Sequence, residues 1–305
     1  MKMINKLISQ TLPFFPKRFV WIFSKKYIAG ETLDEALLAS RQLNEKGIMA
    51  TIDLLGEFIT NLDQAHENKM SYLNIIRTFC QSGIKANFSL KPTSFGLLLD
   101  EEVCYQNIRE IVGCAASFGN FVRIDMEDAK CVDMEIALYN KLRDEFPLTV
   151  GLVLQAYLKR TFADLEKFVS SHTPDKPVNF RLCKGIYVES PDIVYKERQM
   201  INDNYLKCLE LLLSRGVYVG IATHDREVVT GALALIEKFQ LTPDKYEFQM
   251  LYGVTPDLRE QLVRSGHRLR VYVPYGKDWF GYSTRRLKEN PQIANHIIKS
   301  IFVRG

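Results

Sequence analysis

From about residue 47 onward, the chain alternates between short runs of β-branched and apolar residues and longer stretches with helical periodicity. The short runs lie at 48–54, 84–90, 121–125, 149–155, 178–183, 217–223, 246–251 and 268–273. Between the sixth and seventh of these runs, apolar residues recur at spacings of three and four, as one buried helix face requires. They are Val228, Ala232, Leu235, Ile236 and Phe239. Strands that alternate with helices, and that never follow one another as hairpins, indicate βαβ units and a parallel sheet.

Eight such units suit a closed (βα)8 barrel of the TIM type better than an open sheet, and a length of 305 residues fits that α/β fold. We therefore predict that residues 47–305 form a barrel and that residues 1–46 form an N-terminal helical extension, with a helix at about 32–46. Residues 100–118 are expected to form an extra helix before the third strand. Ser190-Pro191 is expected to open a long helix that runs towards Leu213, because serine caps helices and proline fits their first turn.

The charge distribution argues against a nucleic-acid-binding domain. The formal net charge is only +4, and residues 1–30 contain six lysine and arginine residues and no acid. The remainder is therefore nearly neutral. The basic arm also carries Phe14, Phe15, Phe19, Trp21 and Phe23, a composition typical of a helix that lies on a membrane surface. An ordinary helix packed against the barrel is the alternative for this arm.

The six cysteines are scattered without any C-x-x-C spacing, which favours a reducing compartment and predicts no metal site. No apolar run reaches the ~18–20 residues that a membrane-spanning helix needs. The N-terminus lacks a continuous signal-type apolar segment, since prolines and lysine pairs interrupt it. We expect a cytoplasmic protein, with peripheral contact at the inner face of the cell membrane as an alternative.

Polar side chains stand near the carboxyl ends of the predicted strands, where buried parallel strands should be apolar. They are Lys91, Asp125, Gln155, Arg181, Lys184, Thr223, His224, Gln249 and Tyr272. Beyond the last strand, Tyr282 precedes Arg285 and Arg286 by three and four residues, so a helix would place them on one face. Each residue alone could be a satisfied core group or part of a solvated face. Because active sites of such barrels lie at this end, the set predicts the active site.

The predicted site has five cations against one clear interior carboxylate, Asp125. The forked guanidinium groups of adjacent arginines suit a carboxylate or a phosphate, so the ligand should be an anion. Backbone N–H groups of a helix that starts near Tyr282 would add donors. The chain contains neither G-x-G-x-x-G nor a P-loop motif, which excludes those nucleotide sites. A barrel aldolase with Lys184 or Lys91 as its Schiff-base lysine stays open at this point.

Seven segments resemble the proline dehydrogenase family. They are RIDMED (123–128), LQAYLKRT (154–161), RLCKGIYVES (181–190), ATHD (222–225), EFQMLYG (247–253), RVYVPYG (270–276) and YSTRRLKEN (282–290). The combination of R-x-x-K-G with Y-x-x-R-R-x-x-E-N is the most specific part of this similarity, which spans about residues 48–291. The resemblance implies a distorted (βα)8 barrel that binds FAD and oxidises L-proline to Δ1-pyrroline-5-carboxylate.

The resemblance also implies roles for single residues. The positions that match substrate-binding residues are Lys91, Tyr272, Tyr282, Arg285 and Arg286. The lysine and the two arginines are expected to bind the substrate carboxylate, and the two tyrosines are expected to line the pocket of the proline ring. Arg181 matches the arginine that faces flavin N5, and Asp125 matches the aspartate beside the substrate lysine, so both are expected to be catalytic. The matched FAD-contacting positions, besides Arg181, are Met126, Gln155, Lys184, Gly185, Ile186, Thr223 and His224, to which we add Gln249.

One position departs from the family pattern. Many relatives have an aromatic residue after the tyrosine of K-G-x-Y, where this chain has Val188. Stacking at that edge of the flavin is therefore not expected from this residue.

The implied reaction transfers a hydride from proline C5 to flavin N5, and a cation near N5 would stabilise the reduced anionic flavin. The substrate amine must be neutral, whereas a free secondary ammonium has a pKa of about 10. We expect the nearby cations to lower this pKa, so that no strong general base is required and activity rises with pH.

The family passes its electrons to membrane quinone, which makes a quinone the expected acceptor. The length leaves no room for a second enzyme domain, so a separate pyrroline-5-carboxylate dehydrogenase is expected to take the product. A hydroxyproline dehydrogenase is the nearest alternative, although the bulk of Tyr272 favours proline. A non-catalytic flavin or amino-acid sensor is the alternative from another class.

Overall fold

Eight parallel strands close into a barrel in the computed structural model, which describes residues 20–21, 24–56 and 59–283. The strands are β1 (Met49–Leu54), β2 (Ala86–Leu90), β3 (Val122–Ile124), β4 (Val150–Gln155), β5 (Asn179–Cys183), β6 (Tyr218–Ala222), β7 (Tyr246–Leu251) and β8 (Leu269–Tyr275). Each strand pairs with its neighbours in chain order, and β8 pairs with β1 to close the sheet. The predicted barrel and its eight strands are therefore confirmed.

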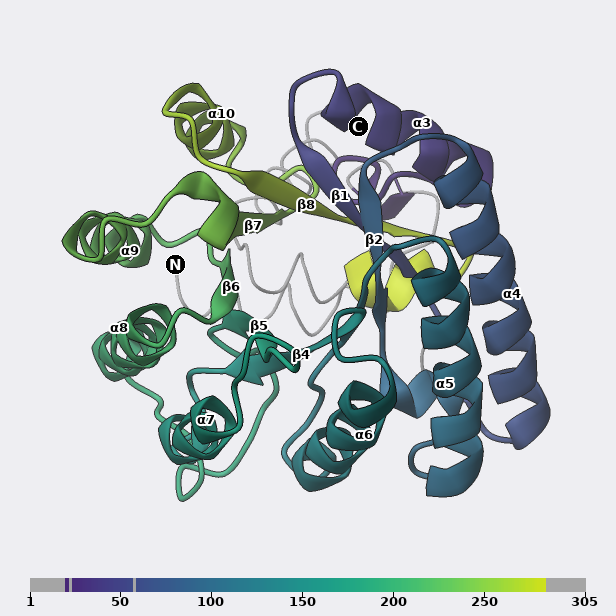
Figure 1. The fold of residues 1–305 in the computed structure, drawn as a ribbon. Coiled ribbons are helices and arrows are strands. Elements are labelled where there is room, and N and C mark those ends of the chain that lie inside the picture. Colours follow the sequence, from purple (N-terminus) through teal and green to yellow (C-terminus); the bar gives the residue numbers. More distant parts are fainter. Residues whose placement is uncertain (1–19, 22–23, 57–58, 284–305) are drawn as a thin grey trace, which may run out of the picture.

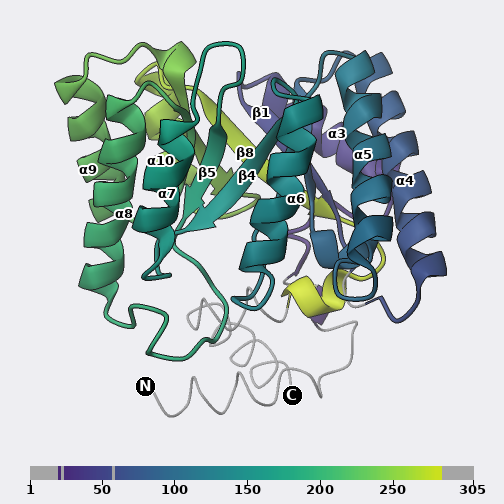
Figure 2. The same ribbon diagram turned by 60° about the horizontal axis from the view of Figure 1, so that its bottom comes forward.

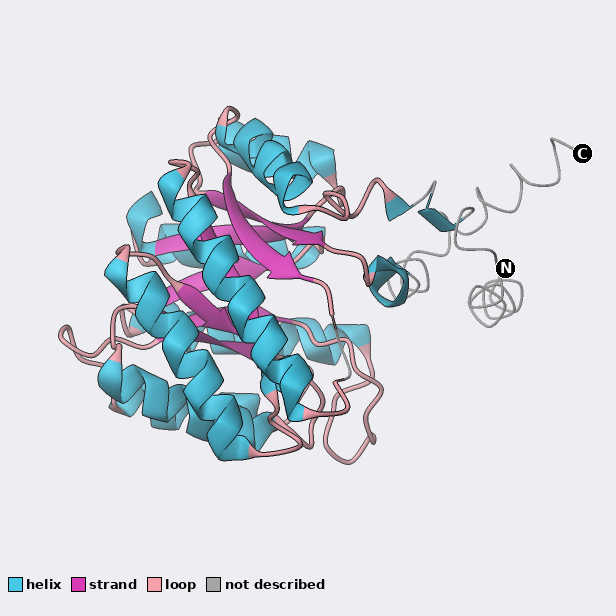
Figure 3. Cartoon of the chain, turned by 90° about the vertical axis from the view of Figure 1, so that its right-hand side faces the viewer, coloured by secondary structure: helices cyan, strands magenta, loops and turns pink. Residues whose placement is uncertain are grey.

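Helices surround the strands on the outside (Figure 1). Consecutive strands are joined through α4 (Leu62–Gln81), α5 (Glu101–Ser117), α6 (Val132–Glu145), α7 (Thr161–Ser170), α8 (Arg198–Ser214), α9 (Arg226–Lys238) and α10 (Pro256–Arg264). Two 3₁₀ turns, η2 (Pro92–Phe95) and η3 (Pro243–Lys245), follow β2 and precede β7. Figures 2 and 3 show the same arrangement from the side, with the helices packed over the strands.

The helix predicted at 32–46 is present as α3 (Leu33–Asn44). It starts with a capping box, in which the Thr32 side chain accepts from Glu35 N and the Glu35 side chain accepts from Thr32 N. α3 packs against β1 and β8, beside the seam where the barrel closes. It thereby takes the place in the ring between α10 and α4 (Figure 1). The boundary between arm and barrel at residues 46 and 47 stays a prediction.

Two helix predictions were wrong in detail. The helix expected at 100–118 is α5, and it is the ordinary crossover between β2 and β3 rather than an extra element. Ser190-Pro191 does not open the following helix, because α8 begins only at Arg198. The intervening residues instead run beside the loop after β4, where Val194 forms a β-bridge with Leu158. This pairing keeps the chain out of helical conformation until it has passed that loop.

Apolar and polar residues of the strands are sorted between the two faces of the sheet. Residues such as Ile52, Phe88 and Phe180 are fully buried in the apolar core. The alternate residues face the inside of the barrel, as shown by hydrogen bonds that connect strands which are not neighbours: Arg123 on β3 bonds Asn179 on β5, at 2.6 Å for the Nη2–Oδ1 pair. The barrel interior is therefore a polar, hydrogen-bonded layer, and its carboxyl end holds the site described below.

The described part of the N-terminal arm packs on the barrel. Val20, Tyr27 and Ile28 are buried. The backbone N–H of Ala29 donates to the Pro274 carbonyl at 2.9 Å, directly beside the end of β8. Residues 20–21 and 24–30 thus behave as the packed alternative predicts, while residues 1–19 lie outside the described part of the chain. Within the residues that the structure describes, no helix is long and apolar enough to cross a membrane.

Candidate functional site

A cavity of about 450 Å³ opens at the carboxyl ends of the strands. It is lined by every predicted site residue that the structure describes: Lys91, Asp125, Met126, Gln155, Arg181, Lys184, Gly185, Ile186, Thr223, His224, Gln249, Tyr272 and Tyr282. The two remaining predicted residues, Arg285 and Arg286, lie outside the described residues. The fold therefore gathers at one place side chains that are spread over almost 200 positions of the sequence.

Asp125 is the centre of the hydrogen bonding in this cavity. It directly follows β3, and its backbone N–H donates to the Leu90 carbonyl at 2.8 Å, which fixes the position of its carboxylate. Oδ1 accepts from Ser89 Oγ at 2.6 Å and from Arg181 Nη1 at 2.7 Å. Oδ2 accepts from the Tyr272 hydroxyl at 3.0 Å. One carboxylate thus holds side chains from β2, β5 and β8 in a single arrangement.

Arg181 is oriented by two further contacts. Its Nε donates to Gln249 Oε1 at 2.6 Å, and the Nε2 group of Gln249 donates in turn to Glu247 at 2.6 Å. Its Cζ lies 5.3 Å from the centroid of the Tyr272 ring, a cation–π contact. The remaining nitrogen, Nη2, is buried and has no hydrogen-bond partner among the described residues. A guanidinium held on three sides with one donor left over is suited to a ligand that brings an acceptor.

Lys91 also lines the cavity and bonds both oxygens of Asp53, at 2.7 and 2.9 Å. Asp53, on β1, is only 1% exposed. The Lys91 ammonium also lies 3.5 Å from the Tyr272 hydroxyl, which links it to Asp125. The positive charge of Lys91 is therefore balanced within the barrel by a carboxylate that sequence reasoning did not include.

Lys184 has a similar partner. Its Nζ forms an ion pair with Asp225, which also bonds Arg198 at 2.9 Å and caps the start of α9 through Glu227 N at 3.1 Å. Burial of Asp225 by itself would raise its pKa, but the bonds from Lys184 and Arg198 outweigh this effect and lower the pKa to about 2. The carboxylate is thus charged at neutral pH.

These pairs correct the charge balance predicted from the sequence. Asp125 was expected to be the one clear carboxylate of a cation-rich site, yet Asp53 and Asp225 accompany Lys91 and Lys184. The positive charges of these two lysines and of Arg181 are each paired with a carboxylate, whereas the lowered pKa expected for a substrate amine near the five cations stays a prediction. The sequence did not reveal the pairing because partners of each pair lie on different strands or at different strand ends.

Gln155 and Gly185 line the cavity at the carboxyl ends of β4 and β5. Gln155 is 1% exposed, and its Nε2 donates to the carbonyls of Met126 and Glu127, both at 2.8 Å. Its Oε1 has no partner among the described residues. Gly185 has φ +103, and a Cβ there would lie 2.1 Å from Cδ1 of the Tyr157 ring. Only glycine fits, because the Tyr157 ring packs directly against the backbone here and the φ angle is positive.

His224 and Thr223 follow β6 and are held by backbone contacts. The Nε2 atom of His224 accepts from the Leu251 N–H at 2.9 Å, which ties the end of β6 to the end of β7. The Thr223 hydroxyl accepts from Asp225 N at 3.1 Å. Because Nε2 of His224 accepts this hydrogen bond, it is the unprotonated nitrogen of the ring. The structure thus presents both residues to the cavity in a fixed orientation.

Tyr282 reaches the cavity from a helical segment at 279–283 that follows β8, and it is only 8% exposed. Trp279 in the same segment donates to Glu31 at 2.7 Å, and its ring lies 4.7 Å from that of Trp21. The N-terminal arm therefore helps to place the segment that carries Tyr282. The predicted common face of Tyr282, Arg285 and Arg286 extends beyond the described residues and stays a prediction.

Sequence reasoning missed Ser89, Asp53, Asp225 and Glu247 as members of the network. Asp53 could have been found, because it is an acid near the carboxyl end of an apolar strand, as Asp125 is. Val188, which departs from the family pattern, is 97% exposed and does not line the cavity. In the described part of the chain, no three His, Cys, Asp or Glu residues gather in a way that could hold a metal ion.

Comparison with known proteins identifies the family. The chain matches the family model described as Proline dehydrogenase over residues 36–298. It is 34% identical over 294 residues to Proline dehydrogenase 1 of Bacillus subtilis, which covers 96% of this chain and 95% of that protein. It is also 34% identical over 286 residues to the Proline dehydrogenase of Deinococcus radiodurans, covering 92% of this chain and 91% of that protein.

Solved structures support the fold. The structure superimposes on proline utilization A (PutA) from Bdellovibrio bacteriovorus, inactivated by N-propargylglycine, with a TM-score of 0.83 and 24% identity, covering 88% of this chain and 32% of that one. A variant of PutA from Bradyrhizobium japonicum gives a TM-score of 0.73 at 22% identity, covering 88% of this chain and 32% of that one. The chain therefore spans about a third of these longer proteins. Taken with the family model and the close match in length to the monofunctional relatives, these findings show that this chain belongs to the proline dehydrogenase family of oxidoreductases.

Proposed function

We propose that this chain uses FAD to oxidise L-proline to Δ1-pyrroline-5-carboxylate and delivers the electrons to a quinone. Family membership supports the substrate, and the observation that carries the cofactor is the state of Arg181. Its guanidinium is fixed by Asp125 and Gln249, lines the cavity, and keeps one buried nitrogen without a partner among the described residues. A ligand with an acceptor atom, such as a flavin ring, would satisfy that nitrogen.

The residues along one side of the cavity fit such a ring. Gln155 Oε1 is a second buried atom without a partner among the described residues, and it could accept from a ring N–H. Gly185 lines the same side, and its backbone packs directly against the Tyr157 ring, where a Cβ would lie 2.1 Å from Cδ1. The residues that would hold FAD are Met126, Gln155, Arg181, Lys184, Gly185, Ile186, Thr223, His224 and Gln249. When bound, the flavin would supply the hydride acceptor, N5, for the hydrogen at proline C5.

Arg181 and Asp125 would act together at the reacting atoms. Positive charge beside the hydride acceptor stabilises negative charge that develops there, which is what a preorganised guanidinium supplies. Asp125 keeps the guanidinium in place through the 2.7 Å bond, so that no reorganisation is needed during the reaction. The carboxylate would also keep the Tyr272 ring against the substrate side of the cavity.

The substrate would be held by Lys91, Tyr272, Tyr282, Arg285 and Arg286. Because Lys91 is already paired with Asp53, the arginine pair would supply most of the attraction for the substrate carboxylate. Tyr272 and Tyr282 line the cavity from two different segments and would enclose the ring. This clamp would hold C5 at the roughly 3–3.5 Å separation that hydride transfer requires.

Tyr272 would not serve as a general base. Burial and the nearby Asp125 charge raise its pKa well above its usual value, so its hydroxyl stays protonated and donates to Asp125. The substrate would therefore enter as the neutral amine after losing its proton to solvent. The proposed reaction therefore needs no side chain as a general base.

The aldolase alternative fits the site poorly. A Schiff-base lysine must be free to attack a carbonyl carbon, whereas Lys184 and Lys91 are each held in an ion pair with a carboxylate. A hydroxyproline dehydrogenase would need extra room beside the ring, where Tyr272 stands fixed by Asp125. A sensor without activity would not require the Arg181 and Asp125 arrangement, so the enzyme is the favoured function.

The electron acceptor and the partner enzyme follow from the family. A quinone in the membrane would reoxidise the flavin, and a separate pyrroline-5-carboxylate dehydrogenase would use the product. The basic residues before residue 20 would then meet the membrane surface, while residues 24–30 pack on the barrel. Deleting residues 1–19 should reduce co-sedimentation with anionic liposomes, and unchanged co-sedimentation would remove this part of the proposal.

The proposed reaction is tested with the purified enzyme, a soluble quinone analogue and two substrates. With L-proline we expect quinone reduction and a product that o-aminobenzaldehyde traps as the dihydroquinazolinium adduct of the pyrroline. Trans-4-hydroxy-L-proline should give at least tenfold lower kcat/KM, because an added hydroxyl must be desolvated against the Tyr272 side of the cavity. Equal or higher kcat/KM with hydroxyproline would instead assign the enzyme to the hydroxylated substrate.

A further inference from the structure

A second cavity, of about 320 Å³, lies at the amino ends of the strands, opposite the candidate active site. Its lining includes Lys85, just before β2, with Arg123 on β3, Glu247 on β7 and Arg270 on β8. None of its lining residues also lines the cavity at the carboxyl ends. The proposed reaction makes no use of this end of the barrel.

Arg123 is buried in an unusual environment for a cation. It is 1% exposed, and its hydrogen bonds go to neutral groups: Nη1 to the Asn179 carbonyl at 2.8 Å and to the Leu152 carbonyl at 3.3 Å, and Nη2 to Asn179 Oδ1 at 2.6 Å. Nε is buried and has no partner among the described residues. A buried guanidinium normally has a carboxylate beside it, because moving a charge out of water without an opposite charge nearby costs free energy.

The chain makes room for this side chain. A Cβ at Gly151 on β4 would lie 2.3 Å from Nη1 of Arg123, so only glycine allows the guanidinium to occupy this position. Burial, with a smaller effect from the Arg181 charge, lowers the pKa of Arg123 to about 9, and the group is still a cation at neutral pH. The guanidinium thus occupies a place built for it and retains its charge.

The one carboxylate in the cavity lining, that of Glu247, already accepts hydrogen bonds on both of its oxygens. Glu247 accepts from Arg270 Nε at 2.7 Å and Gln249 Nε2 at 2.6 Å on one oxygen, and from the Tyr218 hydroxyl at 2.9 Å on the other. Glu247 therefore bonds Arg270 directly and acts on Arg123 only through its charge, which partly offsets the effect of burial on the Arg123 pKa, while Lys85 is exposed at this cavity. The lining residues carry three positive charges against one negative charge.

We propose that this cavity binds a small oxyanion, of the phosphate or carboxylate class, between Arg123, Arg270 and Lys85. The forks of both arginines already donate within the barrel, and Arg123 Nε is the buried donor without a partner among the described residues. An oxyanion would accept a charge-assisted hydrogen bond from it, and a cavity of this size admits a group of a few atoms. Lys85 stands at the exposed end of the cavity and attracts the ion, while Arg123 supplies the buried charge. Binding compensates the buried guanidinium, so it stabilises the folded protein.

The experiment measures thermal unfolding of the full chain, as purified with its cofactor, during titration with inorganic phosphate. Sodium chloride at matched ionic strength is the reference, and sodium acetate in a parallel titration separates a phosphate from a carboxylate preference. We expect Tm to rise and saturate with one of the two oxyanions above the chloride reference. Lys85→Gln should raise the half-saturating concentration at least threefold, while kcat/KM for L-proline stays as in the unmodified enzyme.

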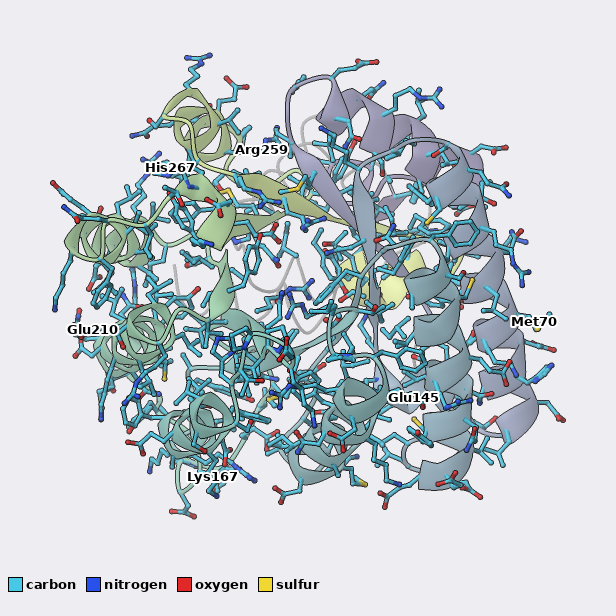
Figure 4. All side chains as sticks on the ribbon, in the orientation of Figure 1. Met70, Glu145, Lys167, Glu210, Arg259 and His267 are labelled. Carbon is cyan, nitrogen blue, oxygen red and sulfur yellow. The ribbon has the colours of Figure 1, made fainter. Side chains whose placement is uncertain are left out.

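Lys167→Gln is the matched control, because Lys167 lies on α7 on the outside of the barrel (Figure 4) and is 81% exposed. It should titrate as the unmodified protein does. Arg123→Gln should abolish the saturable rise where it folds, but the decision rests on Lys85→Gln, whose side chain is exposed. The proposal is overturned by a Tm that does not saturate above the chloride reference, or by Lys85→Gln titrating unchanged.

An oxyanion that binds at the carboxyl-end cavity instead would compete with the substrate. Phosphate would then raise KM for L-proline in proportion to its concentration, and Lys85→Gln would leave the Tm titration unchanged. That combination would also overturn the assignment to the amino-end cavity.

Discussion

Arg181 and Asp125 meet across the inside of the barrel, with Nη1 of the arginine 2.7 Å from Oδ1 of the aspartate and both side chains largely buried. They come from β5 and from the end of β3, which are separated by β4 in the sheet. The same carboxylate accepts from Tyr272 through its other oxygen. One acid therefore fixes both the cation proposed to face the cofactor and the tyrosine proposed to face the substrate.

Asp125→Asn removes the charge of this acid and keeps its size. We expect kcat/KM for L-proline to fall by about 100-fold, since the amide keeps one acceptor oxygen where the carboxylate has two, so Arg181 and Tyr272 can no longer both be held, and small misplacements are costly in hydride transfer. Steady-state kinetics with flavin content measured in parallel will show this. Asp175→Asn, on an exposed loop before β5, is the control and should retain full activity. A similar loss in both variants would remove the special role of Asp125.

Arg286→Ala tests the carboxylate clamp inferred from the family motif. Truncating one partner of a desolvated charge pair should cost about 3 kcal/mol, seen as a rise in KM of roughly 100-fold. Lys288→Ala, two positions further along the chain, should leave KM within about twofold because Lys288 stands at an unspecified position of the Y-x-x-R-R-x-x-E-N motif. An unchanged KM in Arg286→Ala would reject the clamp.

The pH dependence of kcat/KM should report the substrate amine. Below its pKa of about 10, the neutral amine increases about tenfold per pH unit, so kcat/KM should rise between pH 6 and 9. Tyr272 has a pKa raised well above its usual value by burial and by Asp125, so it stays protonated over this range and cannot cause the rise. Tyr272→Phe should therefore be less active but keep the same slope. A flat profile in the unmodified enzyme would contradict the proposed entry of the neutral amine.

Asp225→Asn should destabilise the protein in a pH-dependent manner. Its pKa is about 2 in the folded state, against 3.8 for an unperturbed aspartate, because the bonds from Lys184 and Arg198 outweigh its burial. A lowered pKa stabilises the folded state above the unfolded value and ceases to do so as pH falls through the folded value. Urea unfolding should show a loss of about 2 kcal/mol at pH 7, shrinking as pH falls from 4 towards 2. A loss independent of pH would mean that Asp225 acts through packing alone.

The barrel could be predicted from the sequence because its strands are separated by periodic helices. The apolar face of α9 shows the signal clearly, with Val228, Ala232 and Ile236 all buried. The start of α8 could not be predicted, since Ser190-Pro191 has the local pattern of a helix start, whereas the β-bridge between Val194 and Leu158 depends on the tertiary structure. Local rules cannot anticipate a contact between segments that meet only in the folded chain.

The sequence predicted which residues form the site better than it predicted which of their charges are paired. Polar residues at strand ends are conspicuous in a sequence, so Asp125, Arg181 and Tyr272 could be grouped before their contacts were known. The pairing of Lys91 with Asp53 could not, because charge balance depends on which side chains face each other across the barrel. The positions of Arg285 and Arg286 remain predictions from the motif.

The most direct measurement is the absorbance spectrum of the purified protein before and after anaerobic addition of L-proline. We predict a yellow protein whose flavin absorbance band in the blue region of the spectrum bleaches when the substrate is added and returns when a quinone analogue is added. Arg181→Met should bleach far more slowly at the same flavin content. A colourless protein that releases no flavin on denaturation, or a flavin band that L-proline leaves unchanged, would contradict the proposed function.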